Sequence, residues 1–107
     1  YTAVNKEFTN PRDVRAAGAK LTEHILTERP ETDGIIYTTD LLAIGGLEAA
    51  KKMGKRIPEE LAIMGVDNTM YGEIVTPKLS SLDNKLVEVS QNASRRILDA
   101  LIKRSVP

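Results

Sequence analysis

The hydrophobic residues of segment 11–28 repeat at the period of an α-helix. Asn10 and Pro11 precede the repeat, and these residue types favour the N-cap and the first helical position. Pro30 disfavours helical backbone just before it, which predicts that the helix ends near Glu28. The apolar residues that recur at steps of three and four residues are Val14, Ala17, Leu21 and Ile25.

Two continuous apolar runs without polar alternation follow, at 33–39 and 61–66. Short runs of this kind, bounded by turn residues, are typical of strands covered on both faces. A helix is predicted between them, capped by Thr39 or Asp40 and closed by Gly54. A short strand at 79–82 and a long amphipathic helix from residue 86 complete the pattern.

Strand, helix and strand in succession predict a parallel sheet, and thus an α/β fold. We expect three layers, with helices on both faces of the sheet. Segment 67–78 contains Gly72 and Pro77 and is expected to form an irregular loop. The adjacent residues Gly45 and Gly46 lie within the predicted second helix, where they favour close packing against a neighbouring element.

The amino-acid composition limits the kinds of functional site that the chain can contain. Fifteen Lys and Arg balance fifteen Asp and Glu, which argues against a nucleic-acid-binding surface within these residues. The chain has no Cys, so disulfides and thiolate metal sites are excluded. No apolar run is long enough to span a membrane, and the composition fits the cytoplasm. Its one His, His24, is predicted on a solvated helix face, and we expect no catalytic residue, metal or cofactor.

Polar residues follow both central strands. The first run ends in Thr38, Thr39 and Asp40, and the second in Asp67 and Asn68. Neighbouring parallel strands end at the same edge of a sheet, and open α/β folds bind ligands at that edge. Carboxylates and amides suit hydroxyl groups, so a sugar or nucleoside is the expected ligand. The alternative is purely structural, with Asp40 as a helix cap and Asp67 beginning a turn.

Three motifs along the chain resemble the LacI/GalR family of transcription regulators. They are DGIIYTTDLLAIG at 33–45, KRIPEELAIMGVDN at 55–68 and TPKLSSL at 76–82. The family shows an apolar strand followed by Asn-Asp or Thr-Asp, then x-V-P-x-D-I-x-V-x-G-F-D-D, then P-P-L-T-T-V. Val66 departs from the usual aromatic residue, and Asn68 from a second Asp.

This resemblance implies a two-lobed fold of the periplasmic-binding-protein type I kind, with an effector between the lobes. Residues 1–82 would form most of the carboxyl-side lobe, and 83–107 a helix returning to the other lobe. The DNA-binding headpiece would lie outside the chain. The function implied is effector sensing and homodimerisation by a regulator that binds operator DNA through that headpiece.

The resemblance also implies residue roles. Thr39 and Asp67 match effector-contacting positions, and Asp40 and Asn68 adjoin them. Phe8 is a candidate for stacking on the effector. The helix and loop that form the family's dimer contact correspond here to Ile44, Leu47, Tyr71 and Val75.

Three alternatives remain open from the sequence. A periplasmic sugar-binding protein of an ABC importer would have the same fold; a signal peptide in the full gene would favour it, and a helix-turn-helix headpiece would favour the regulator. A regulator with a GntR-type winged-helix headpiece would also share this core. A small α/β enzyme would use Asp40 and Asp67 as its acid and base.

Overall fold

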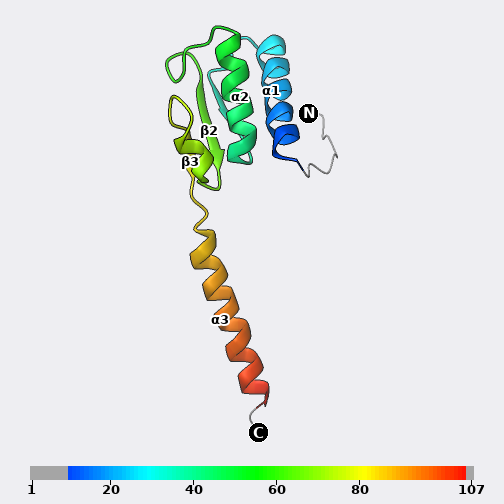
Figure 1. Ribbon diagram of the computed structural model, residues 1–107, viewed down its shortest axis with the longest axis vertical. Coiled ribbons are helices and arrows are strands. Elements are labelled where there is room, and N and C mark those ends of the chain that lie inside the picture. Colours follow the sequence, from blue (N-terminus) through cyan, green and yellow to red (C-terminus); the bar gives the residue numbers. More distant parts are fainter. Residues whose placement is uncertain (1–9, 106–107) are drawn as a thin grey trace.

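The computed structural model of the chain describes residues 10–105 (Figure 1). It consists of three α-helices, three strands and one 3₁₀ turn within this range. In chain order these elements are α1 (Pro11–Glu28), β1 (Gly34–Ile36), α2 (Asp40–Lys52), β2 (Ala62–Val66), η1 (Met70–Glu73), β3 (Ser80–Leu82) and α3 (Leu86–Ser105).

The strands form one parallel sheet in the order β1-β2-β3. Ile35 pairs with Ile63, and Gly65 pairs with Ser81. Every strand therefore ends at the same edge. This arrangement confirms the predicted parallel α/β fold class.

Both helix starts follow from their capping residues. The Asn10 side chain accepts a hydrogen bond from the Arg12 N–H at 3.0 Å, with Pro11 in the first turn. Thr39 caps α2 by accepting from the Leu42 N–H at 3.3 Å. Gly54 follows the end of α2 with a φ of 81°, a conformation that favours glycine. These ends confirm the predicted helix boundaries.

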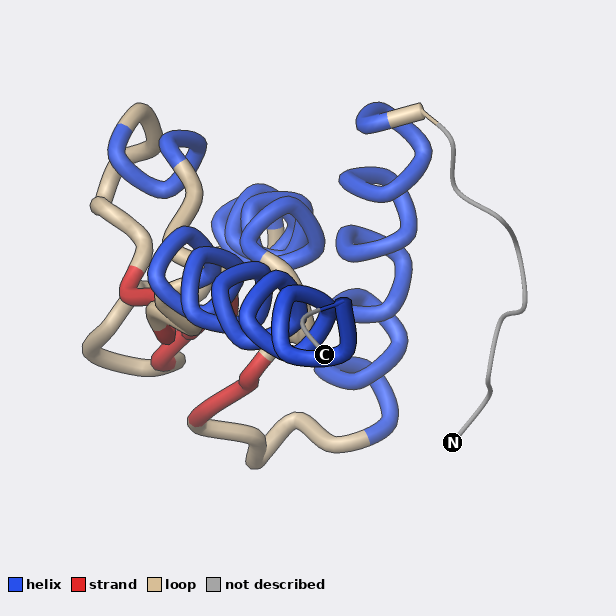
Figure 2. The backbone as a smooth tube through the Cα atoms, turned by 90° about the horizontal axis from the view of Figure 1, so that it is seen from below, coloured by secondary structure: helices blue, strands red, loops and turns tan. Residues whose placement is uncertain are grey.

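Helix α2 lies between α1 and the sheet (Figures 1 and 2). The two helices approach so closely that a Cβ on Gly18 would lie 2.1 Å from the Leu42 carbonyl oxygen. A Cβ on Gly45 would lie 1.9 Å from the carbonyl oxygen of Arg15. The expected close packing at Gly45 and Gly46 is therefore real, and the element against which Gly45 packs is α1.

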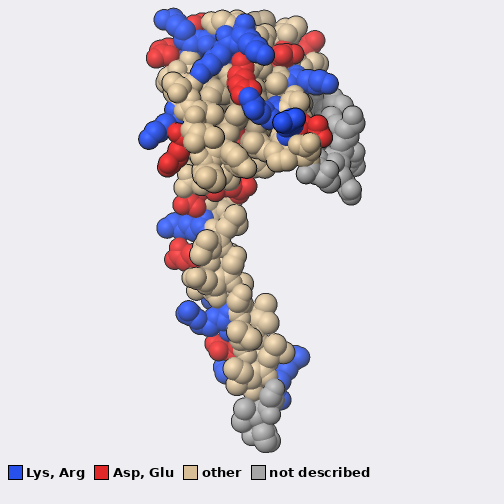
Figure 3. Space-filling model, viewed as in Figure 1, with Lys and Arg blue, Asp and Glu red and all other residues tan. Residues whose placement is uncertain are grey.

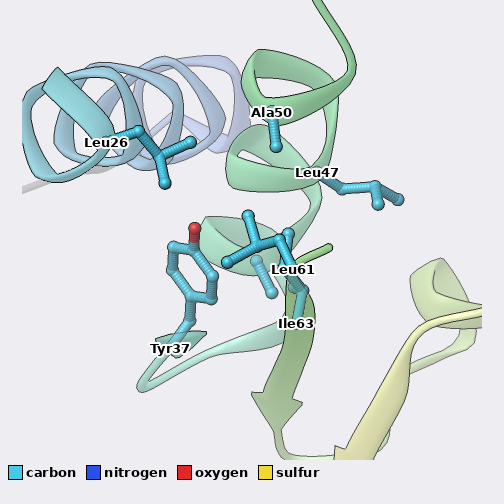
Figure 4. Packing of buried hydrophobic residues seen from close by; sticks show 7 residues of the cluster. Leu26, Tyr37, Leu47, Ala50, Leu61 and Ile63 are labelled. Carbon is cyan, nitrogen blue, oxygen red and sulfur yellow. The ribbon is translucent and has the colours of Figure 1, made fainter. Parts of the chain in front are cut away.

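The hydrophobic core lies between α2 and the sheet, with Leu26 of α1 contributing from the side (Figure 4). Leu61 has no exposed surface, and Ile63 points from β2 towards α2. The buried cluster consists of Leu26, Tyr37, Ala43, Leu47, Ala50, Leu61 and Ile63. A core without Trp or Phe is thus assembled mainly from aliphatic side chains.

The opposite face of the sheet is open within residues 10–105. Ile36, Met64 and Leu82 are 75%, 41% and 56% exposed, and burial alternates along β2. The sequence led us to expect helices on both faces. Instead, α1 packs against α2 through Gly18 and Gly45, so it does not cover the second face.

Helix α3 extends away from the sheet, and the chain measures 67 × 28 × 23 Å along its principal axes (Figure 1). Its hydrophobic residues are more than half exposed. They include Leu86, Val89, Ile97, Leu98, Leu101 and Ile102.

Candidate functional site

The polar residues that follow β1 and β2 meet at the carboxyl edge of the sheet, as the topology predicts. Asp40 begins α2 just beyond β1, and Thr69 lies in the loop beyond β2. The Thr69 N–H donates a hydrogen bond to Asp40 Oδ2 at 2.6 Å. This bond joins residues that are 29 positions apart in the sequence.

The Asp40 carboxylate is at the centre of a buried hydrogen-bond network. Its Oδ2 also accepts from Thr69 Oγ1 at 2.9 Å, and its Oδ1 accepts from Ser81 Oγ at 2.5 Å. Asp40 is only 1% exposed. Burying a carboxylate is costly unless hydrogen bonds satisfy its oxygens, and here both oxygens are occupied. No exposed oxygen is left for contact with an effector.

Gly65 provides the space for this carboxylate on β2. A Cβ at position 65 would lie 2.3 Å from Asp40 Oδ1. The glycine of the IMGVD stretch therefore allows the carboxylate to lie directly over the strand. Nothing in the sequence marks Gly65 for this role, because its lack of a side chain is informative only once Asp40 is placed.

The turn at Asp67 and Asn68 carries the exposed part of the site. Both residues have positive φ, 97° and 50°, which is uncommon for residues other than glycine. The Asp67 N–H donates to the Leu82 carbonyl oxygen at 2.8 Å, and the Asn68 N–H donates to Ser81 Oγ at 2.9 Å. Hydrogen bonds from β3 thus hold the turn on one side.

An open hollow of about 490 Å³ lies beside this turn, where the sheet meets α3. Asn84 Nδ2 donates to Asp67 Oδ1 at 3.0 Å, and Lys85 and Asp83 line the hollow. Figure 3 shows acidic groups at this neck between the sheet and α3. Asp67 Oδ2 has no protein hydrogen bond within the described residues, so the carboxylate retains an acceptor for a hydroxyl group.

The sequence-predicted effector residues differ in how exposed they are. Asp67 and Asn68 line the hollow, whereas Thr39 is half-buried and caps α2. Asp40 is buried beneath them. Phe8 lies outside the described residues. Sequence reasoning missed Ser81, Asp83 and Asn84. The only signal was the pair of serines at 80 and 81 in the short third strand, and the sequence does not say which of the two faces Asp40.

The predicted dimer residues also differ in how exposed they are. Ile44 and Leu47 are 5% and 3% exposed, so they face the interior of this chain and leave little surface for a second copy. Val75 is half-buried and packs against the core. Tyr71 is 43% exposed in η1 and remains accessible.

Other potential sites carry no chemistry within residues 10–105. A larger hollow of about 650 Å³ follows a single side of α3, and no second element encloses it. His24 is exposed on α1. Among the described residues, no group of His, Asp and Glu is arranged to hold a metal ion. No helix in this range is both long and apolar enough to cross a lipid bilayer.

The model of the periplasmic binding protein-like domain family matches residues 1–107. The chain belongs to this family. Among curated relatives of this domain, the ribose operon repressor of Halalkalibacterium halodurans is 32% identical over 85 residues, covering 79% of this chain and 26% of that protein.

The chain is also similar to solved structures of LacI-family regulators. A LacI family transcriptional regulator from Arthrobacter sp. FB24 in complex with lactose is 37% identical with a TM-score of 0.69, covering 92% of this chain and 34% of that one. A LacI-family regulatory protein from Corynebacterium glutamicum is 34% identical with a TM-score of 0.75, covering 87% and 35%.

These neighbours confirm the resemblance of this domain to LacI-family transcription regulators. The chain spans 26% to 35% of the length of these three proteins.

Proposed function

We propose that this periplasmic binding protein-like domain is the effector-sensing part of a cytoplasmic, DNA-binding transcription regulator of the LacI type. The observation that carries the proposal is the Asp67 carboxylate at the carboxyl edge of the parallel sheet, beside an open polar hollow. Ligands of open α/β folds bind at this edge. The relatives that support a regulator include the ribose operon repressor.

A sugar is the proposed effector class. The hollow presents carboxylate and amide groups from Asp67, Asn68 and Asp83, which accept and donate hydrogen bonds to hydroxyl groups. One regulator similar to this domain was solved in complex with lactose. A phosphorylated ligand fits less well, because the acidic neck would repel its charge.

The remaining parts of the proposal concern the larger protein. Residues 1–82 contribute to one lobe, 83–107 lead to the other, and a separate headpiece contacts operator DNA. Homodimerisation would use the surface around η1, where Tyr71 is accessible and Met70 and Ile74 are 77% and 76% exposed. Large exposed apolar groups gathered on one short turn are typical of protein interfaces.

The test is binding of a panel of sugars, beginning with lactose and ribose, to the intact protein by calorimetry and thermal shift. Ligand that binds the native state raises the melting temperature by mass action. In Asp67→Asn, we expect sugar binding to weaken by at least about tenfold, since a hydrogen bond to a charged group contributes about 1.5–3 kcal/mol. Asn tolerates positive φ, so this variant keeps the turn conformation.

The matched control is Asp33→Asn, which removes an exposed carboxylate before β1, at the opposite end of the strand. It is expected to bind the same sugar as the parent protein. Equal weakening in both variants would point to overall charge instead of a site at Asp67. Binding that Asp67→Asn leaves unchanged would place the effector elsewhere.

A further inference from the structure

We infer that Asp40 and Ser81 are positioning residues of the effector site: they hold the turn at Asp67 and Asn68 in its left-handed conformation and so aim the Asp67 carboxylate at the ligand. This inference rests on the proposed function. It assigns to Asp40 a role different from direct effector contact, which its burial prevents.

The turn requires support from outside itself. Asp67 and Asn68 take positive φ in succession, and neither is a glycine. Such conformations persist only when the surrounding structure over-determines them. Without that support, the backbone at these positions would relax and the Asp67 side chain would change direction.

The support reaches the turn by two routes from one carboxylate. In the first, Asp40 Oδ1 accepts from Ser81 Oγ, and the same hydroxyl oxygen accepts from the Asn68 N–H. In the second, Asp40 Oδ2 accepts from both the N–H and the hydroxyl of Thr69. The two residues that follow Asp67 are thereby tied to a single buried group.

That group stands on a rigid base. Asp40 is in the first turn of α2, where the helix dipole favours a negative charge. Helix α2 is in turn packed against α1 through backbone contacts and against β2. The carboxylate is therefore fixed relative to the sheet, and the hydrogen bonds transmit this fixed position to the turn.

The experiment compares Ser81→Ala with the parent in the intact protein, by calorimetric titration of the sugar that binds most tightly. Asp40→Asn alone would not decide the matter, since it disturbs a buried group and can unfold the domain. Ser81→Ala removes only the relay, and we expect affinity to fall about tenfold with the thermal transition retained. The control Ser80→Ala lies on the open face of the sheet and should bind normally.

A second variant and a ligand-free measurement separate positioning from direct contact. Ser81→Thr keeps a hydroxyl that can accept from the Asn68 N–H and donate to Asp40, so its affinity should stay close to that of the parent. Loss of affinity in Ser81→Ala together with faster exchange of the Thr69 N–H in the ligand-free protein supports the inference. An unchanged affinity in Ser81→Ala overturns it, as does a loss without faster exchange, because Ser81 would then contact the effector itself.

A measurement that needs no ligand tests the positioning role even if the proposed function is wrong. If the parent binds no sugar, hydrogen exchange of the Thr69 N–H decides, since its own acceptor on Asp40 survives in Ser81→Ala. Faster exchange at Thr69 in Ser81→Ala, but not in Ser80→Ala, shows that the turn is held as one unit. Equal exchange in the two variants overturns the positioning role.

Discussion

At the scale of single residues, hydrogen-bond direction can be read from the number of protons available. Thr22 Oγ1 donates its only proton to the Gly18 carbonyl oxygen at 2.7 Å. The Tyr37 hydroxyl, 2.5 Å from the same oxygen, must therefore be the donor to Thr22. Both side chains are buried, and Gly46 leaves room for them.

This arrangement predicts a pH-dependent stability. Burial raises the pKa of Tyr37 above its ordinary value of 10.0 and outweighs the smaller lowering that comes with its hydrogen-bond partner Thr22. The folded state thus keeps the phenol proton that the unfolded chain releases, so stability is full below pH 10 and falls as pH rises through the folded pKa. Tyr37→Phe is expected to cost about 1 kcal/mol at neutral pH.

Urea unfolding of the parent and of Tyr37→Phe, at neutral pH and above pH 10, measures this effect. The difference in unfolding free energy between the two proteins should shrink in the alkaline range. A difference that stays constant with pH would contradict the assignment of the alkaline loss to Tyr37.

Residues differ in how far the sequence alone can place them. Asn10 and Thr39 were predictable as caps, because capping depends on residues adjacent in the chain. Asp67 was predictable at the carboxyl edge of the sheet from strand order. Ser81 was not, because its partners Asp40 and Asn68 are 41 and 13 positions away and only the folded chain brings them together.

At the scale of elements, α1 and α2 are joined by backbone contact as well as by side-chain packing. Gly18 and Gly45 each face a carbonyl oxygen of the other helix. An ion pair between Arg15 and Glu48 adds to the same interface at its exposed rim. Exposed ion pairs contribute little, so the small residues set the distance between the helices.

Gly45→Ala tests this packing. Alanine is intrinsically the better helix former, yet its Cβ would lie 1.9 Å from a backbone atom that cannot move without separating the helices. We expect a net loss of about 1–3 kcal/mol in the free energy of unfolding. Chemical denaturation followed by circular dichroism measures it.

Gly34→Ala is the matched control, since its Cβ would meet nothing nearer than the Ala62 carbonyl oxygen at 3.9 Å. That change should stay within about 0.5 kcal/mol of the parent. A Gly45→Ala protein as stable as the control would show that the helices tolerate a wider separation.

Element type and order were predictable from periodicity and turn residues, whereas the covering of the sheet was not. Apolar runs such as 61–66 indicate strands but do not say which helix packs on which face. The position of α1 was decided by Gly18 and Gly45 meeting backbone, a contact that hydrophobic periodicity does not encode.

At the scale of the whole molecule, stability is unevenly distributed. The core joins α1, α2 and the sheet, whereas α3 shares no extended packing surface with another described element. Isolated helices gain little stability in water without tertiary contacts. The exposed apolar residues of α3 also favour association with another apolar surface.

In the 107-residue chain, hydrogen-exchange rates should therefore differ between the two sides of the neck that joins the sheet to α3. Amides of α2 should exchange only on global unfolding, and those of α3 should be protected by roughly tenfold at most. Strong protection throughout α3 at low protein concentration would contradict this, since it would mean that the helix docks on the chain's own open face. Protection that appears only at high concentration would indicate association between copies.

Strand order has a consequence for biosynthesis. Each strand pairs with the next one to leave the ribosome, and the whole buried cluster lies before the end of β2 at Val66. A growing chain can therefore close its core before β3 has been translated. The turn at Asp67 and Asn68 acquires its Ser81 hydroxyl only afterwards. The nascent domain can thus become compact before the turn that carries Asp67 is held in place.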